Sequence, residues 1–399
     1  MTVARVASAI LVSAVLVSAT LAQVPGAAKA WPVGVTSTAT VEPITNPVVA
    51  LPGASSALLL RYRSTSIAGT PVALTGSLLL PKTAVPHDGW PLAVWNHMTV
   101  GGADKCAPSR ARRGMSAYAD MTSGDLTVAA LLRAGFAVVR PDYEGIGSAG
   151  PHPYLIGRSL ATSVIDAATA ARAIDPRIGQ DVVVAGHSEG AVAALFAAAE
   201  PEKRWGDMQL RAVAAYTPPT RIADLVSVIG DVPVASRPVT GDLVALAALL
   251  VSGATQVDTD FARLIRNGGL SPRAQALMPQ VETKCFRDLA ETDSFGGLAP
   301  REVLGPKGDR AKARLATIVD ANDVAHLNFP SHLPVRIDAG IIDAVIPLPF
   351  AVELADTYRR RGVPVTYAQH LAGHSTVPRA PATAGDVVGW LARRAGVGR

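Results

Sequence analysis

A single serine stands between a buried-strand pattern and a helix pattern, and this junction constrains the fold more than any other feature of the chain. Residues 181–185, Asp-Val-Val-Val-Ala, predict a strand, and the alanine-rich residues 190–199 predict the helix that follows it. Residues 186–190 read Gly-His-Ser-Glu-Gly and fit the pattern Gly-x-Ser-x-Gly. Small residues around a serine permit a sharp strand-to-helix turn that presents its hydroxyl. We therefore predict that Ser188 is a nucleophile and not part of an ordinary tight turn.

Strands and helices are predicted to alternate through most of the chain. Residues 31–53 are expected to wrap the surface, and two early strands, 57–64 and 71–81, to form an antiparallel hairpin. The later predicted strands are 92–96, 136–140, 181–185, 212–216, 335–338 and 364–367, and the predicted helices are 126–134, 159–174, 190–199, 349–361 and 384–395. Such alternation is typical of a mostly parallel sheet covered by helices. Together with the serine turn, it predicts an α/β-hydrolase fold.

One long segment, residues 218–333, interrupts this alternation. Connections between the strands of such sheets are usually far shorter. Residues 242–250 within the segment are apolar nearly all round, so a helix there must be buried on several sides. We predict a helical cap over residues 218–333, inserted after the sixth core strand. The hydrolase core would then consist of residues 31–217 and 334–399.

The first 30 residues have the pattern of a targeting segment. A short basic start precedes the apolar residues 6–22, and residues 28–30, Ala-Lys-Ala, have the small-x-small form of a signal-peptidase site. The apolar run is shorter than the roughly 20 residues that a membrane span prefers. We predict a signal peptide over residues 1–30 and a secreted protein, with a retained anchor as the alternative.

Composition excludes some classes of partner. The formal net charge is +5, and Arg5 and Lys29 carry two of those charges within the predicted signal peptide. A charge this small and dispersed argues against nucleic acid as a partner. The 17% of charged and 49% of hydrophobic residues suit a well-buried enzyme, and they leave the oligomeric state open. Cys106 and Cys285 are the two cysteines, and in an exported protein such a pair suggests one disulfide, with two buried free thiols as the alternative.

A nucleophilic serine needs a base, and two histidines lie where this fold would supply one. The chain order in such hydrolases is Ser, then Asp or Glu, then His. Downstream of the last predicted strand the candidates are His370 and His374. His374 lies in the loop before the last helix, where its ring can lean over the edge of the sheet, whereas His370 still belongs to the strand end. We favour His374.

An imidazole needs a carboxylate to fix its tautomer, and two aspartates are candidates. The strand that begins at Val335 ends near Gly340, which places Asp343 on the loop beyond its carboxyl end. Ligands of open α/β sheets meet that edge. Asp338 lies within the strand and is expected to form structural hydrogen bonds. We favour Asp343.

Backbone amides are expected to hold the oxyanion of the tetrahedral intermediate. One donor should be the amide of Glu189, directly after the nucleophile. The other should come from residues 97–102, where Met98 and Thr99 are both candidates, although a glycine-permitted turn is the plainer interpretation of this loop. The Glu189 carboxylate is expected to point away and pair locally, since a negative charge nearby would oppose the oxyanion.

Two further patterns are weaker than they look. Residues 145–150 fit Gly-x-Gly-x-x-Gly with Asp166 downstream, but prolines follow directly, where a dinucleotide fingerprint needs a helix. His370 and His374 have the spacing of a zinc pair on a helix, but a strand and a glycine deny them a helix. We therefore predict neither a cofactor nor a metal.

Several motifs together resemble those of the secretory lipase family, the group of the fungal A-type lipases. They are residues 186–190, the loop 96–101, Cys-Ala-Pro-Ser at 106–109, Asp-Tyr-Glu-Gly at 142–145 and the long insertion before the candidate acid. The resemblance extends from the first predicted strands to the C-terminus.

The resemblance implies site residues and a disulfide. It implies Ser188, Asp343 and His374 as the catalytic triad and a bond between Cys106 and Cys285. The function predicted is that of a secreted serine ester hydrolase, a lipase or carboxylesterase, which acts through an acyl-enzyme on acyl esters or lipids and adsorbs to lipid interfaces. The alternatives are an acyltransferase that uses the same acyl-enzyme, and an inactive scaffold that binds a ligand or partner. Acyl chain length and cap mobility stay open.

Overall fold

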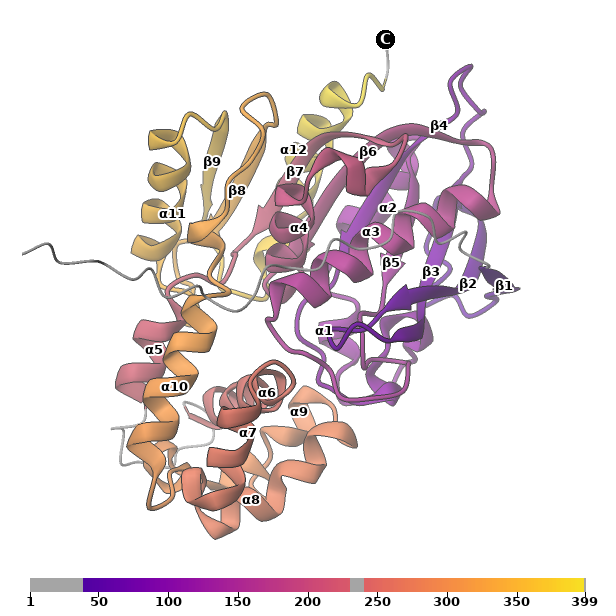
Figure 1. Ribbon diagram of the computed structural model, residues 1–399. Coiled ribbons are helices and arrows are strands. Elements are labelled where there is room, and N and C mark those ends of the chain that lie inside the picture. The colour runs from indigo at the N-terminus through magenta and orange to yellow at the C-terminus, as the bar shows by residue number, and fades with distance from the viewer. Residues whose placement is uncertain (1–38, 230–239, 398–399) are drawn as a thin grey trace, which may run out of the picture. The chain divides into compact units, whose positions relative to one another are not determined.

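A mixed sheet of nine strands is the framework of the computed structural model, which describes residues 39–229 and 240–397 (Figure 1). The order across the sheet is β1-β2-β3-β5-β4-β6-β7-β8-β9. Strands β5, β4, β6, β7, β8 and β9 run parallel, and β1, β2 and β3 add an antiparallel edge. The strands are β1 Thr40–Pro43, β2 Ala54–Thr65, β3 Pro71–Pro81, β4 Trp90–Asn96, β5 Ala137–Pro141, β6 Ile178–His187, β7 Gln209–Tyr216, β8 Val335–Gly340 and β9 Val365–His370.

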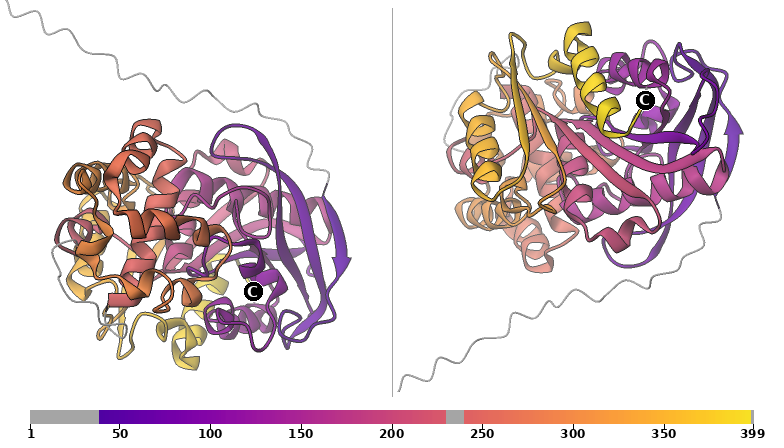
Figure 2. Two further views of the ribbon diagram at one scale, coloured as in Figure 1. Left: turned by 90° about the horizontal axis from the view of Figure 1, so that it is seen from below. Right: turned by 90° about the horizontal axis from the view of Figure 1, so that it is seen from above.

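Both faces of the central strands are buried under helices (Figure 2). In β6, Val182 and Val184 belong to a core cluster shared with α3 and α4, whereas Val183 and Ala185 belong to a second cluster shared with α2 and α12. Burial on both sides explains why the central strands read as continuous apolar runs. The flanking helices are α2 Asp125–Ala134, α3 Gly157–Ile174, α4 Glu189–Ala199, α11 Leu348–Arg360 and α12 Pro381–Arg394.

The α/β-hydrolase fold and every helix and strand predicted from the sequence outside the inserted segment are confirmed, with ends that differ by a few residues. The early hairpin is confirmed as well, because β2 and β3 pair antiparallel along their length. The last helix begins at Pro381 and not at residue 384. Proline suits the first turn of a helix because its missing N–H would have no partner there.

The N-terminal edge of the sheet differs from the prediction. Thr40–Pro43 was expected within a surface-wrapping segment, but it forms β1, which pairs antiparallel with β2. All four residues are exposed and lack an alternating apolar pattern, so their extended form depends on backbone pairing with β2. The long insertion follows β7, which is the seventh strand in chain order because β1 is counted. Among the strands predicted from the sequence, the same strand is the sixth. The predicted signal peptide lies outside the described residues.

Helices fill the long segment between β7 and β8 (Figure 1). As predicted, α6 is buried on several sides, with Val244, Ala248 and Leu249 all inaccessible. Among the described residues no helix is both long and apolar enough to span a bilayer. The α-helices of the segment are α5 Ile222–Ile229, α6 Asp242–Thr255, α7 Thr259–Leu264, α8 Pro272–Leu277, α9 Phe286–Leu289 and α10 Gly308–Asp320.

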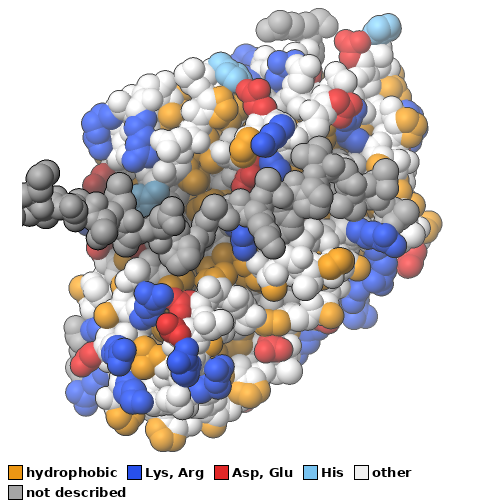
Figure 3. Space-filling model, viewed as in Figure 1, with side chains coloured by type: hydrophobic (Ala, Val, Ile, Leu, Met, Phe, Trp, Pro, Cys, Tyr) orange, Lys and Arg blue, Asp and Glu red, His pale blue; other side chains and the backbone are white. Residues whose placement is uncertain are grey.

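Charged side chains of both signs are mixed on the face of the molecule in Figure 3, with several Lys and Arg side chains in its lower part. Acidic side chains lie among them, so this face carries no field of a single sign. The picture agrees with the small net charge of +5.

Candidate active site

Ser188 occupies a strained turn between β6 and α4. Its φ of 56° and ψ of −118° are unusual for a residue with a side chain, and its amide donates to the Tyr216 carbonyl at 2.9 Å. A Cβ on Gly190 would overlap the Asn96 carbonyl oxygen, and one on Gly186 would overlap the Gly190 carbonyl oxygen. Both glycines are therefore required for the tight approach of strand, turn and helix that positions the serine.

Ser188, His374 and Asp343 form a continuous chain of hydrogen bonds. Ser188 Oγ lies 2.8 Å from His374 Nε2, and His374 Nδ1 lies 2.8 Å from Asp343 Oδ2. Ser188 is 6% exposed, His374 8%, and the side chain of Asp343 1%, so water competes little for these bonds. The geometry is that of a hydroxyl facing an imidazole whose other nitrogen is held by a carboxylate.

Neighbouring groups hold the acid and the histidine in place. Asp343 Oδ1 accepts hydrogen bonds from the amides of Val345 and Ile346, both at 2.8 Å. His187 Nε2 donates to the His374 carbonyl at 2.8 Å. Burial and the nearby His374 ring lower the pKa of His187 well below its ordinary value, so His187 stays neutral. No local pattern signals this role, because the second position of Gly-x-Ser-x-Gly carries no fixed residue type.

The less favoured candidates, Asp338 and His370, lie together elsewhere in the sheet. Asp338 makes a two-pronged ion pair with Arg336 at 2.8 Å and accepts from His370 Nε2 at 2.8 Å. The other ring nitrogen of His370 faces Thr383 Oγ1 at 3.2 Å. Both side chains are thus engaged in a structural network that ties β8 and β9 to α12.

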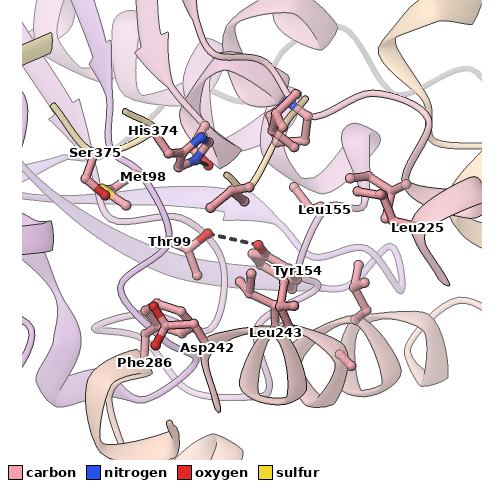
Figure 4. A pocket seen from close by; sticks show the side chains of 18 of the residues that line it. Met98, Thr99, Tyr154, Leu155, Leu225, Asp242, Leu243, Phe286, His374 and Ser375 are labelled. Carbon is pink, nitrogen blue, oxygen red and sulfur yellow. Dashed lines mark hydrogen bonds between the residues drawn. The ribbon is translucent and has the colours of Figure 1, made fainter. Parts of the chain in front are cut away.

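The residues expected to supply the oxyanion donors either follow the serine directly or line the same pocket. Glu189 is the first residue of α4, so its amide has no acceptor within the helix. Met98 and Thr99 are buried and line the same pocket as Ser188 and His374. Thr99 Oγ1 lies 2.9 Å from the Tyr154 hydroxyl, which fixes this loop (Figure 4). Both amides of the loop remain candidates for the second donor.

An apolar cavity of about 130 Å³ opens beside Ser188 and His374 (Figure 4). Its walls come from the loops that carry the triad and from α5, α6 and α9. The lining side chains beyond the triad include Met98, Thr99, Tyr154, Leu155, Ile222, Leu225, Val226, Leu243, Leu246, Leu250, Phe286, Val345 and Ile346. Helices of the long segment between β7 and β8 thus form part of an apolar wall beside Ser188 and His374.

Comparison with known families identifies the chain. The model of the family "Secretory lipase" matches residues 113–397. The chain belongs to the secretory lipase family. A relative from Mycobacterium tuberculosis (strain CDC 1551 / Oshkosh), described as a probable inactive lipase, is 27% identical over 357 residues, which are 86% of this chain and 74% of that protein.

Solved structures of lipases and esterases share the fold. Candida antarctica lipase A in its closed state matches with a TM-score of 0.69 and 18% identity, over 88% of this chain and 82% of that chain. The rice cell wall degrading esterase LipA from Xanthomonas oryzae matches with a TM-score of 0.63 and 18% identity, over 85% and 89%. These likenesses show that the chain shares the α/β-hydrolase fold of those proteins.

A disulfide joins the loop after β4 to the inserted helices. Cys106 and Cys285 are bonded, with 5.6 Å between their Cα atoms, so the alternative of two free thiols is wrong. Beside the bond, the Phe286 amide donates to the Val100 carbonyl at 2.9 Å. A Cβ on Gly101, whose φ is +115°, would press on the backbone of Cys285 and Phe286. The segment that carries Met98 and Thr99 is therefore fixed to α9.

We expect the double substitution C106A/C285A to lower the melting temperature and to reduce hydrolysis of long-chain esters more than of acetate. The two cysteines are 179 positions apart, and chain entropy for a closed loop of that length gives about 5 kcal/mol. Loss of the bond also loosens the wall of the cavity near α9. Thermal melts and ester assays measure both effects, and the double variant avoids a lone reactive thiol. Two free thiols in the denatured, unreduced wild-type protein would contradict the bond itself.

The glycine-rich turn and the histidine pair lack the helix that each of the two ligand motifs requires. Residues 145–150 follow β5, but α3 begins only at Gly157, so no helix opens from the glycines. Asp166 lies within α3 and accepts from Ser64. His370 ends β9 and His374 lies in a turn, so the two share no helix face. Within residues 39–229 and 240–397, no group of three or more His, Cys, Asp or Glu side chains could hold a metal ion.

The Glu189 carboxylate is paired, but its partner lies far away in the sequence, whereas a local partner was expected. Glu189 Oε1 accepts a hydrogen bond from His152 Nε2 at 2.6 Å, and both side chains are buried. His152 lies 37 positions earlier, after the glycine-rich turn. A Cβ on Gly145 would overlap the backbone of His152, so the tight turn sets where this histidine lies. No local sequence pattern signals such a long-range pair.

Proposed function

We propose that this protein is a secreted serine ester hydrolase that cleaves acyl esters, lipids among them, through an acyl-enzyme. The observation that carries the proposal is the hydrogen-bond chain from Ser188 through His374 to Asp343 at the wall of an apolar cavity. Membership of the secretory lipase family supports it. The fold alone would not, since one fold hosts many activities.

The proposed reaction follows from the positions of the reacting atoms. Ser188 Oγ attacks the ester carbonyl while His374 Nε2 takes its proton, and Asp343 holds the imidazolium that forms. The Glu189 amide and the amide of Met98 or Thr99 donate to the oxyanion. His374 then gives its proton to the leaving alcohol, and an acyl-enzyme remains. Water, deprotonated by His374, attacks the acyl carbon, and Ser188 leaves with its proton restored.

The apolar walls suit the hydrocarbon part of an acyl ester. Leu243 and Leu246 of α6 and Ile346 of the acid loop all face the cavity. Each methylene group that leaves water contributes about 0.8 kcal/mol. We propose that residues 218–333 act as a cap that keeps water from the acyl chain, on a core formed by residues 31–217 and 334–399.

Two other functions use the same site. An acyltransferase would pass the acyl group from Ser188 to an alcohol instead of water. A binding scaffold without activity is the second, because the relative from Mycobacterium tuberculosis is described as a probable inactive lipase. One observation argues against an inactive scaffold: this chain has a nucleophile, a base and an acid within hydrogen-bond distance of one another.

The deciding experiment is hydrolysis of p-nitrophenyl esters from acetate to palmitate, with and without an alcohol acceptor, beside labelling by a fluorophosphonate. We expect labelling, and turnover that yields free acid. Ester product that dominates with the acceptor would favour acyl transfer. A folded protein that neither labels nor turns over any ester would favour the scaffold.

We expect Leu246→Trp to lower kcat/KM for long-chain esters by roughly 10- to 100-fold relative to acetate, because the indole fills space that the chain needs. Leu126→Trp is the matched control, since Leu126 is 45% exposed on α2 and belongs to no wall of the cavity. Equal losses for acetate and palmitate in Leu246→Trp would mean that the acyl chain binds elsewhere.

Export is part of the proposal. The pattern of residues 1–30 and the secretory family support a signal peptide, and a mature N-terminus at Trp31 in protein recovered from the medium would test it. A retained anchor would instead leave the full-length protein in the membrane fraction.

A further inference from the structure

A buried acid–imidazole pair lies directly beside the nucleophile. Glu189, one residue after Ser188, is 1% exposed, and His152 is 3% exposed. Both nitrogens of the His152 ring face oxygen acceptors, Glu189 Oε1 at 2.6 Å and the Glu144 carbonyl at 2.7 Å. A ring that donates from both nitrogens is an imidazolium. With Glu189 ionised, both ring nitrogens donate, and the pair is then an imidazolium and a carboxylate with no net charge.

The surroundings favour this protonated state. Burial disfavours the charged ring, but the charge and the hydrogen bond of Glu189 outweigh it and raise the pKa of His152. A buried carboxylate without a counter-charge is costly and acts over a long range at low dielectric. If the ring lost its proton, Glu189 would hold such a charge one residue from the reacting oxygen.

No second cation among the described residues replaces His152. The titratable groups around the pair are His97, Asp142, Tyr143, Glu144 and Tyr154. Burial lowers the pKa of His97 and raises those of the two tyrosines, so these three groups are neutral at neutral pH. Asp142 and Glu144 are each bound by hydroxyl and amide donors of their own.

The same ring also lies within the packing that holds the oxyanion loop. His152 stacks on Tyr143 at 6.2 Å between ring centres, and its edge meets Tyr154 at 6.1 Å. The Tyr143 hydroxyl donates to the His97 carbonyl at 3.1 Å, and Tyr154 bonds Thr99. His152 therefore contacts, through two tyrosines, the segment that offers the second oxyanion donor.

We propose that His152 is a positioning and charge-balancing residue for the oxyanion site: its proton keeps the Glu189 side chain from opposing the negative oxyanion that forms between the two backbone donors. The inference rests on the proposed function, because it concerns the same tetrahedral intermediate. The proposed role of His152 explains how an acidic residue can occupy position 189, where an unbalanced negative charge would slow the reaction.

A double-mutant cycle tests the proposal. His152→Gln keeps a donor toward Glu189 but removes the charge, and we expect kcat for a short ester to fall on the order of 10²-fold with little change in KM. Glu189→Gln removes the negative charge and should cost less. The double variant H152Q/E189Q should be at least tenfold faster than H152Q, since no uncompensated charge remains. If the ring served packing alone, the double variant would be as slow as H152Q or slower.

The pH profile is the second readout and does not depend on the fold of H152Q. Since protonated His152 is the productive form, the rate of fluorophosphonate labelling should fall as the pH rises through the raised pKa of His152. That alkaline fall should vanish in Glu189→Gln, which needs no counter-charge. Identical alkaline limbs in wild type and E189Q, or a double variant no faster than H152Q, would overturn the proposal alone. Wild-type protein that does not label at all would overturn the proposed function with it.

Discussion

Ser188→Ala should abolish ester turnover and fluorophosphonate labelling while the protein still folds. The serine donates its hydroxyl hydrogen to His374 across 2.8 Å, and no other side chain is in position to take its place as nucleophile in that chain of hydrogen bonds. Removal of the nucleophile from such a triad costs about 10⁶-fold in kcat. Initial rates on p-nitrophenyl butyrate and labelling of purified protein measure the loss.

The hydrogen-bonded residues Ser188, His374 and Asp343 should act as a unit. Ser188→Ala combined with His374→Ala should cost little more than either substitution alone. Ser66→Ala is the control, since Ser66 lies in an exposed turn and bonds Thr70. Labelling that persists in Ser188→Ala would mean that another residue is the nucleophile.

Asp343→Asn should keep the fold and lower kcat by about 10³- to 10⁴-fold. The amide can present an N–H to His374 Nδ1 and so favours the wrong tautomer of the ring. The turn amides of Val345 and Ile346 hold the group in place and limit its escape to another rotamer. Circular dichroism and thermal melts would check that the fold is kept while initial rates record the loss.

Asp338→Asn is the matched control for the acid. Asp338 is fully buried and neutralises Arg336, so its replacement should lower the free energy of unfolding on the order of 3 kcal/mol and change the rate little. If Asp338→Asn were inactive and Asp343→Asn active, Asp338 would be the carboxylate that orients His374, and Asp343 would have the structural role.

The residues proposed to carry the reaction could be predicted from the sequence because each is tied to a local pattern. The serine lies between glycines that a tight turn requires, and the order of nucleophile, acid and base follows from the order of parallel strands. Asp343 and His374 each follow a strand that ends at the same edge of the sheet. Asp343 and His374 therefore lie close together because β8 and β9 are parallel neighbours. The alternation of predicted strands and helices already indicates such a parallel sheet.

Residues that support the reaction were not accessible in this way. His152 reaches Glu189, and His187 reaches the His374 carbonyl, only through three-dimensional packing. The strand β1 has no apolar alternation, since it depends on backbone bonds to β2. Short polar contacts between distant segments leave no periodic trace in a single sequence.

The bond between Cys106 and Cys285 links the assembly of the site to the redox state of its surroundings. In a reduced chain, the tie between the oxyanion loop and α9 consists of packing and the hydrogen bond from Phe286 to Val100. Thiols stay reduced in the cytosol and pair in oxidising compartments. If the chain is exported as proposed, the compartment in which Cys106 and Cys285 pair is also the one in which the loop of Met98 and Thr99 becomes covalently tied to α9, so the chain is made with a looser site than the folded structure has.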